Sequence, residues 1–318
     1  MNGIPSIFNE KQINCVILGG RHPDKQPLLK VCAILLNGGN MHMRSQNLKS
    51  LEACGFEKII SIETKSKNYN IEDYSQRFPH VKFIIPLESA SDGDLVNLAV
   101  SEVDSPHFLL LRDSLNLSPS LLPSALSEKL SAMNAFCVVP RVLSRGGQAL
   151  PVVFSPSAKK SVLKIDSSAL VHDGKATLYP FNMLGFYDTK KFKELGGYDG
   201  SIDNPYWQNL DLSFRAWLWG ERIVLAASMS LSYCDEILAM DSTPDLSQLR
   251  FFLKNMAPVY KNERAEIPLV KFFGYNRKSS CGLFESFRQF KAARAWVKKN
   301  RCRYKMDAFK FVSEWGRE

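Results

Sequence analysis

Residues 80–113, HVKFIIPLESASDGDLVNLAVSEVDSPHFLLLRD, contain two short apolar runs separated by a helical pattern. The runs at 80–87 and 107–113 are apolar almost throughout, as in strands that are buried on both faces of a sheet. Between them, residues 91–103 repeat apolar side chains at helical spacing. This order predicts two parallel strands joined by a helix that covers the sheet.

The same alternation continues along the chain in both directions. Further strands are expected at 14–20, 31–39, 58–64 and 136–143, with a helix at 43–55. Such α/β sheets are covered by helices on both faces, and they bind ligands at the carboxyl ends of their strands. We therefore expect an α/β fold with a mostly parallel sheet and a site at that edge.

Composition excludes several classes of protein. The 318 residues are 45% hydrophobic, enough for one large or two modest folded domains. No apolar run approaches the roughly 18 residues of a membrane span, and the start MNGIPSIFNEKQ lacks the pattern of a signal peptide. The seven scattered cysteines form no Cys-x-x-Cys pair, which argues against disulfides or zinc. We expect a cytoplasmic protein, or one attached peripherally to the inner face of a membrane.

The positive charge is concentrated at the C-terminal end. The net charge is +9, and residues 271–318 contain 13 Lys and Arg against four acidic residues, so this segment carries the whole excess. This distribution is typical of a neutral domain with a basic extension, and it argues against nucleic acid as a partner.

A helical stripe is expected in this basic extension. One reading is a basic amphipathic helix on an anionic membrane surface. Others are a helix that guides an anionic donor or lipid-phosphate acceptor, and a helix docked on the domain with a solvated basic face. Its members, interrupted by Arg294 and Arg301, are Leu283, Phe287, Phe290, Val297, Tyr304 and Ala308.

Five motifs follow one another over residues 30–235: ILLNGGNMHMRSQNLKSLEACGFEKIISIE, DGDLVNLA, HFLLLRDSLNLSP, FKELGGYDG and QNLDLSFRAWLWGERI. Their order and spacing resemble the GT-A-fold glycosyltransferases of family 2 and the related galactosyltransferase C-terminal module. The resemblance implies a GT-A-like domain at 1–240, with a nucleotide-binding half at 30–125 and an acceptor half at 126–240. A helical basic extension follows at 241–318.

The activity that this resemblance implies is inverting transfer of a sugar from a nucleotide-sugar donor to a hydroxyl group. The acceptor would be a glycan, glycolipid or protein in envelope or surface polysaccharide biosynthesis. Backbone around Gly38 and Gly39 could approach the nucleotide closely. The residues implied in donor binding are Asn37, Glu63, Asp94, Asn97, Arg112 and Asp113.

The family's Asp-x-Asp element falls on Arg112-Asp113-Ser114. That element holds Mg²⁺ or Mn²⁺ at the donor diphosphate. Here one carboxylate remains, displaced by one residue, and neighbouring side chains of a strand point to opposite faces. The sequence therefore weakens the case for a metal at Asp113. Arg112 could instead neutralise the diphosphate through bidentate hydrogen bonds, or it could be a surface residue.

The family's catalytic Glu-Asp pair, at the start of a helix, becomes Gln208-Asn209. A side-chain amide has no basic site, so neither residue can take the proton of the acceptor hydroxyl. Asp211 and Arg215, four residues apart on this helix, have the spacing of an ion pair.

Three carboxylates are the remaining candidates for the base: Asp203, Asp199 and Asp211. The alternative is a GT-A-like domain without catalysis that binds a nucleotide or serves as a scaffolding subunit. A sugar nucleotidyltransferase is disfavoured, because no glycine-rich basic loop follows the first strand.

Overall fold

The computed structural model describes residues 13–21, 26–38, 41–63, 70–159, 162–237, 240–279 and 282–316. Its strands are β1 (Cys15–Gly19), β2 (Leu29–Asn37), β3 (Phe56–Glu63), β4 (Val81–Pro86), β5 (His107–Arg112), β6 (Cys137–Leu143), β7 (Val153–Lys159), β8 (Val162–Ser168), β9 (Gly185–Asp188), β10 (Ile223–Ser232), β11 (Val259–Lys261) and β12 (Arg264–Glu266).

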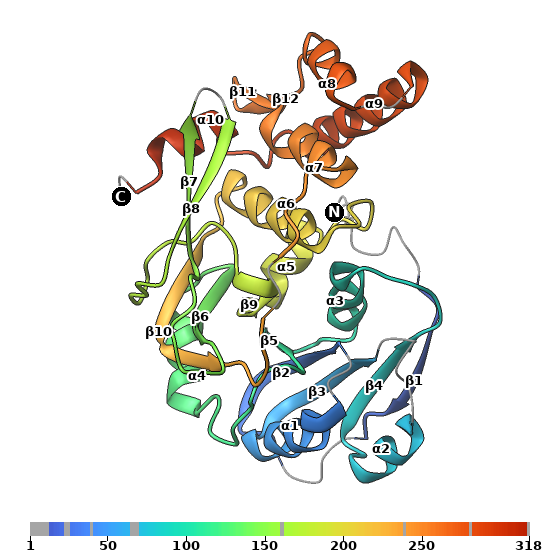
Figure 1. The fold of residues 1–318 in the computed structure, drawn as a ribbon, viewed down its shortest axis with the longest axis vertical. Coiled ribbons are helices and arrows are strands. Elements are labelled where there is room, and N and C mark those ends of the chain that lie inside the picture. The colour runs from blue at the N-terminus through green and yellow to red at the C-terminus, as the bar shows by residue number, and fades with distance from the viewer. Residues whose placement is uncertain are drawn as a thin grey trace.

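Helices lie around and above these strands (Figure 1). They are α1 (Met41–Cys54), α2 (Ile71–Arg77), α3 (Asp92–Ser101), α4 (Ser124–Ala132), α5 (Thr189–Leu195), α6 (Pro205–Leu218), α7 (Leu246–Phe251), α8 (Lys271–Ser279), α9 (Leu283–Asn300) and α10 (Ala308–Glu314). A 3₁₀ turn, η2 (Phe181–Met183), precedes β9, and a π-helical turn, η3 (Phe252–Met256), follows α7. Among the described residues, no helix has both the length and the apolar character needed to cross a bilayer.

The central sheet has eight strands in the order β1-β4-β3-β2-β5-β9-β6-β10. Neighbours β4-β3-β2-β5 are parallel, as are β6 and β10, while β9 runs antiparallel to both β5 and β6. The expected mixed, mostly parallel α/β sheet is confirmed. The first strand differs from the expectation, because β1 pairs antiparallel with β4 at the sheet edge. A short apolar run carries no information on strand direction, which is set by its neighbours.

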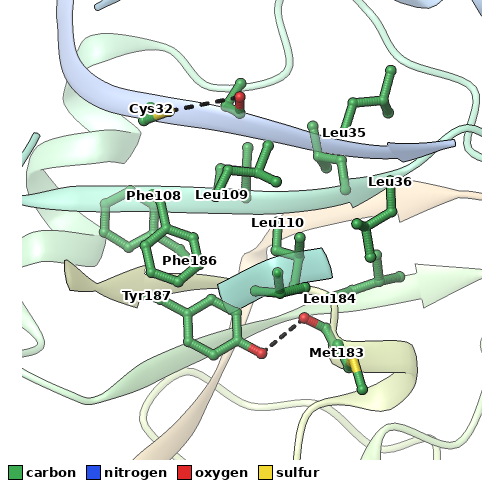
Figure 2. Close-up of a cluster of buried hydrophobic side chains, with 14 of the residues drawn as sticks. Cys32, Leu35, Leu36, Phe108, Leu109, Leu110, Met183, Leu184, Phe186 and Tyr187 are labelled. Atoms are coloured by element: carbon green, nitrogen blue, oxygen red, sulfur yellow. Dashed lines mark hydrogen bonds between the residues drawn. The ribbon is translucent and has the colours of Figure 1, made fainter. Parts of the chain in front are cut away.

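The core lies where β2, β5 and β9 meet (Figure 2). The ring of Tyr187 stacks on Phe108 with centroids 4.9 Å apart, and its hydroxyl donates to the carbonyl oxygen of Met183 at 2.8 Å. Gly185 is needed in this packing, because a Cβ there would lie 2.5 Å from Cys137 Sγ. The tight contact explains how a short antiparallel strand fits between two parallel ones.

Residues 153–159 and 162–168 form a β-hairpin that the sequence did not indicate. Strands β7 and β8 pair antiparallel from Val153 with Ser168 to Lys159 with Val162. Phe154 is buried in a second core, and Leu163 and Ile165 pack against it. The alternation of polar and apolar residues in β8 therefore reflects a sheet with one covered face.

The second core joins α6 to the C-terminal segment. The ring of Phe214 on α6 meets Phe251 of α7 and Phe311 of α10 edge to face, with centroids 5.3 and 5.4 Å apart. Trp207 also contacts Phe251, at 5.6 Å. The C-terminal helices therefore bury the outer side of α6.

The prediction of one continuous helical stripe from 283 to 308 is wrong. Helix α9 ends at Asn300, and a turn separates it from α10. Phe290 and Val297 are buried in the second core, whereas Leu283 and Phe287 are exposed. One part of the stripe therefore packs on the domain and the other faces outward.

Candidate donor and acceptor site

The ends of neighbouring parallel strands bring several predicted residues together. Asn37 at the end of β2 lies opposite Glu63 at the end of β3, and Leu36 lies opposite Arg112 at the end of β5. Asp113 follows directly, and its backbone N–H donates to the carbonyl oxygen of Leu36 at 3.1 Å. Four of the six residues expected in donor binding thus share the carboxyl edge of the sheet, whereas Asp94 and Asn97 lie on α3. Gly39 lies outside the described residues.

Glu63 is held in a buried network rather than at the surface. Its Oε1 lies 2.7 Å from Arg44 Nη2 and accepts hydrogen bonds from Asn37 Nδ2 at 2.9 Å and Ser61 Oγ at 2.8 Å. The Arg44 guanidinium also lies 4.3 Å from the centre of the Tyr74 ring. Burial raises the pKa of Glu63, while Arg44 and the hydrogen bonds oppose that shift. In this arrangement the carboxylate ties two strand ends to α1.

Asp94 and Asn97 organise α3 and its neighbour. The backbone N–H of Asp94 donates to Ser91 Oγ, and the Asp94 carboxylate accepts from the backbone N–H of Ser91, which forms a capping box. Asn97 donates from Nδ2 to the carbonyl oxygen of Tyr198 at 2.8 Å and accepts from its N–H at 2.9 Å. Asn97 therefore fastens the turn at Gly196 and Gly197, which ends α5, to α3.

Arg112 is a cation held in place from two sides. Its Nη2 lies 2.7 Å from Asp92 Oδ2, and its Nε donates to the carbonyl oxygen of Asn182 at 3.1 Å. Asn182 and Met183 have φ values of 52° and 64°, in the left-handed region that such residues rarely adopt. The unusual turn aims a carbonyl group at the guanidinium. Sequence reasoning missed Asp92, since no local pattern reports a contact across 20 residues.

Asp113 is buried beside the end of β10. A Cβ on Gly38 would lie 3.5 Å from Asp113 Oδ1, an ordinary van der Waals contact, so Gly38 and this carboxylate are neighbours. The backbone N–H of Cys234 donates to the carbonyl oxygen of Ser114 at 2.9 Å, so Cys234 lies beside the residues that follow β5. Burial raises the pKa of Cys234, and the charges of Asp235 and Asp113 raise it further. Cys234 and Asp235 had no recognisable motif in the sequence.

The described part of the chain contains no cluster of three or more His, Cys, Asp or Glu side chains placed to hold a metal ion. Mg²⁺ is usually held by only one or two protein carboxylates, with substrate phosphates and water completing its shell. The described residues therefore form no complete ligand set for a cation by themselves, and Asp113 offers one carboxylate at this edge of the sheet.

Gln208 makes three hydrogen bonds, two of which need the N–H donors of an amide. Its Oε1 accepts from the N–H of Gly93 at 3.0 Å, and its Nε2 donates to Ser91 Oγ at 2.9 Å and to the carbonyl oxygen of Asp199 at 3.1 Å. A carboxylate could not donate the last two bonds. Gly93 is required as well, because a Cβ there would lie 2.4 Å from Gln208 Oε1. Gln208 therefore joins the start of α3 to the loop before α6.

Replacing Gln208 by Glu is expected to lower the free energy of unfolding by about 2 kcal/mol, because it buries a charge and removes both donated hydrogen bonds. Urea unfolding at neutral pH measures the loss. Gln148→Glu, at an exposed position, is the control, and its effect should stay within about 0.5 kcal/mol. Equal stability of the two variants would show that the amide is not needed at position 208.

Asn209 is also buried, and its amide is only partly used. Its Nδ2 donates to the carbonyl oxygen of Pro180 at 2.8 Å, and its Oδ1 has no hydrogen-bond partner among the described residues. The side chain anchors α6 to the segment before η2. It offers no group that could accept the proton of a hydroxyl.

Lys254 of η3 lies between two of the candidate bases. Its Nζ is 2.5 Å from Asp199 Oδ2 and 2.9 Å from Asp211 Oδ2, and it lies 4.6 Å from the centre of the Trp296 ring. Asn255 Nδ2 donates to the other oxygen of Asp211 at 2.7 Å. The C-terminal segment thus supplies a cation that both carboxylates share. Lys254 was missed because it lies 43 residues beyond Asp211.

Arg215 completes this buried cluster of charges. Its Nη1 lies 3.3 Å from Asp211 Oδ2, so the ion pair expected from the spacing is present. Its Nη2 donates to the carbonyl oxygen of Gly197. Both side chains are almost completely buried. Asp211 and Arg215 therefore act as structural groups that hold α6 against the Gly196-Gly197 turn.

The three candidate bases differ in their availability. Burial alone would raise the pKa of Asp199, but Lys254 and hydrogen bonds from Lys254 and Ser201 lower it well below its usual range. A carboxylate with so low a pKa is a weak proton acceptor. Asp211 is inaccessible, whereas Asp203 is exposed in the loop before α6. Of the three carboxylates, Asp203 is the most exposed.

No protein-family model matches the chain, and neither does any curated protein sequence. Among solved structures, that of GalNAc-T7 with UDP, GalNAc and Mn²⁺ superposes with a TM-score of 0.60 at 12% identity. The match covers 89% of this chain and 56% of that chain. This chain has a GT-A fold. It spans little more than half of the GalNAc-T7 chain, so the likeness concerns the fold alone.

Two further GT-A glycosyltransferases are more distant. S. aureus TarS 1–349 in complex with UDP-GlcNAc has a TM-score of 0.48 at 10% identity, covering 85% of this chain and 72% of that chain. Mannosyltransferase PcManGT from Pyrobaculum calidifontis, in complex with GDP-Man and Mn²⁺, has a TM-score of 0.47 at 9% identity, covering 91% and 74%. At these scores neither match carries an argument.

Proposed function

We propose that the chain is a glycosyltransferase that moves a sugar from a nucleotide-sugar donor to an acceptor hydroxyl. The observation that carries the proposal is a fixed guanidinium, Arg112, beside Asp113 at the carboxyl edge of a GT-A sheet. This edge is where open α/β sheets bind their ligands. The presence of UDP and GalNAc in the GalNAc-T7 structure supports a nucleotide-sugar donor.

Arg112 is proposed to stabilise the diphosphate leaving group. A guanidinium has five N–H donors, and the contacts with Asp92 and Asn182 use two of them. The remaining donors could bind phosphate oxygens, whose negative charge grows as the glycosidic bond breaks. A cation already held in position stabilises this charge without having to reorganise.

Asp203 is proposed as the base of an inverting reaction, in which it takes the proton of the acceptor hydroxyl as that oxygen attacks the anomeric carbon. We assign the activity to residues 1–240 and a supporting role to the extension at 241–318, which contributes Lys254. A glycan, glycolipid or protein acceptor in envelope or surface polysaccharide biosynthesis belongs to the same proposal, as does a location in the cytoplasm or at the inner face of a membrane.

A thermal-shift and calorimetric screen against UDP, GDP, CDP, dTDP and their sugars tests donor binding. One class of nucleotide should stabilise the protein by about 2.7 kcal/mol when its concentration is about a hundred times the Kd of the complex. Arg112→Ala should weaken that binding by about 10- to 100-fold, the value of hydrogen bonds to a charged group. Arg141→Ala, at an exposed position on β6, is the matched control and should change nothing.

The same screen with Mn²⁺ and with EDTA tests how the diphosphate is neutralised. If Arg112 replaces the metal, EDTA leaves binding intact. Strong sensitivity to EDTA, together with normal binding by Arg112→Ala, would contradict the role of Arg112.

The alternative is a nucleotide-binding or scaffolding subunit without catalysis. It is favoured by two features of the site. Gln208 is an amide where the resemblance implies a catalytic carboxylate. Asp199 and Asp211 are both paired with Lys254. Nucleotide binding without turnover of any bound nucleotide-sugar would support this alternative over the enzyme.

A further inference from the structure

An exposed apolar surface lies on the helical hairpin formed by α8 and α9, at the end of the molecule far from β1 to β4 (Figure 1). Phe284 is 91% exposed and Phe273 is 76% exposed. Monomeric proteins rarely leave such groups of large side chains in water without a function. The hairpin face, in which every side chain is more than half exposed, consists of Leu269, Val270, Phe273, Leu283, Phe284 and Phe287.

Helical spacing and the packing of α8 on α9 place these residues on one side of the hairpin. Phe272 contacts both Phe273 and Phe287, with centroids 5.9 and 5.7 Å apart. The helices are antiparallel, since Phe272 near the start of α8 meets Phe290, and Ser279 at its end bonds Ser286 near the start of α9. In an antiparallel pair of helices, side chains that are rotated by the same angle and in the same sense from the helix–helix contact lie on the same side of the pair. Phe273 on α8 and Phe287 on α9 are placed in this way.

Basic residues lie on the same side at helical spacing. Arg277 follows Phe273 by four residues, and Lys291 follows Phe287 by four. Residues 269–300 contain eight Lys and Arg and one acid, Glu285, which is paired with Arg288 at 2.9 Å. The surface is therefore apolar and cationic at once, a combination that packing on the second core does not require.

We propose that the hairpin face docks on an anionic lipid bilayer. Exposed rings would enter the boundary between headgroups and acyl chains, while Arg277 and Lys291 would meet lipid phosphates. The eightfold excess of basic side chains over acidic ones complements an anionic surface and would repel a basic partner.

The position of the hairpin adds to this proposal. Gln289, Ala293 and Trp296, on the other flank of α9, line a cavity of about 430 Å³ together with Asp199 and Lys254. Docking through the hairpin face would place this cavity on the order of one helix diameter, about 10 Å, from the lipid surface. A membrane-bound acceptor could then reach the loop before α6.

Co-sedimentation of the full chain with vesicles tests the proposal. The protein should bind vesicles of phosphatidylcholine with phosphatidylglycerol and bind poorly to phosphatidylcholine alone. The double variant Phe273→Ser and Phe284→Ser should have a partition coefficient at least about tenfold lower, because it lacks two rings that would be buried in the bilayer. Phe309→Ser on α10 is the matched control, since Phe309 is 81% exposed but lies outside the hairpin face, and it should bind normally.

Charge is tested separately. Arg277→Glu with Lys291→Glu should weaken binding to the anionic vesicles by about tenfold or more, and added salt should weaken binding by the wild type. Normal binding by both double variants would overturn the proposal. So would a dimer in sedimentation velocity, without vesicles, that the Phe273→Ser and Phe284→Ser variant abolishes, because a second copy would then cover the face. All variants should keep the thermal shift with nucleotide, so this test is independent of the proposed activity.

Discussion

Replacement of Lys254 by Met is expected to lower the free energy of unfolding by about 3–5 kcal/mol, because it leaves buried carboxylates without their cation. Lys254 contacts both Asp199 and Asp211, and its side chain is 7% exposed. Methionine has a similar length, so the loss would report the charge rather than a cavity. Urea unfolding at neutral pH measures the effect. Lys299→Met, at an exposed position on α9, is the control, with an expected change within about 0.5 kcal/mol.

The difference in the free energy of unfolding between the wild type and Lys254→Met should depend on pH. Folding lowers the pKa of Asp199 from an ordinary value of 3.8, so this carboxylate stabilises the wild type above pH 3.8, and the contribution is lost as the pH falls toward the folded pKa. In the variant, burial without a cation raises the pKa of the same carboxyl, and protonation then relieves the cost. The difference in the free energy of unfolding between the two proteins should therefore become smaller as the pH falls. A gap below about 1 kcal/mol at neutral pH would contradict the buried-pair interpretation.

Replacement of Asp203 by Asn is expected to lower kcat by about 10²- to 10⁴-fold, the usual contribution of a general base. The donor should bind with unchanged affinity, because Asp203 lies in the loop before α6 rather than at the ends of β2 and β5. Steady-state kinetics with the nucleotide-sugar that the screen identifies, together with calorimetry of the nucleotide, separates turnover from binding.

Asp241→Asn provides a control for Asp203→Asn. Asp241 accepts a hydrogen bond from the N–H of Thr243 at 2.9 Å, which an asparagine can also accept, so both stability and turnover should be retained. In the wild type, the acidic limb of the kcat profile should report the base, and it should disappear from the residual activity of Asp203→Asn. Unchanged turnover by Asp203→Asn would exclude this residue as the base.

The parallel sheet could be predicted because its signal is local. Strands covered on both faces are continuous apolar runs, as in HFLLLRD at 107–113, and the helices between them carry their own periodicity. The direction of β1 and the pairing of β7 with β8 could not be predicted this way. Those features depend on which neighbour a strand meets, and a short polar strand such as β8 resembles a loop until its covered face is known.

The position of the candidate site could also be predicted, because carboxyl ends of parallel strands share one edge. Its contacts could not. No sequence pattern near Arg112 predicts its contacts with Asp92 and with the carbonyl group of Asn182. From the sequence, Glu63 resembles a solvated strand end, and only the structure shows its ion pair with Arg44.

The sequence by itself determined the layered fold and the absence of a base at Gln208 and Asn209, because periodicity and amide chemistry belong to the chain and the side chains themselves. The tertiary structure alone decided that Lys254 pairs with Asp199 and Asp211, and that Phe273 and Phe287 share an exposed face. Such contacts join residues far apart in the chain or on different helices. Their strength depends on burial, which exists only once the elements have packed.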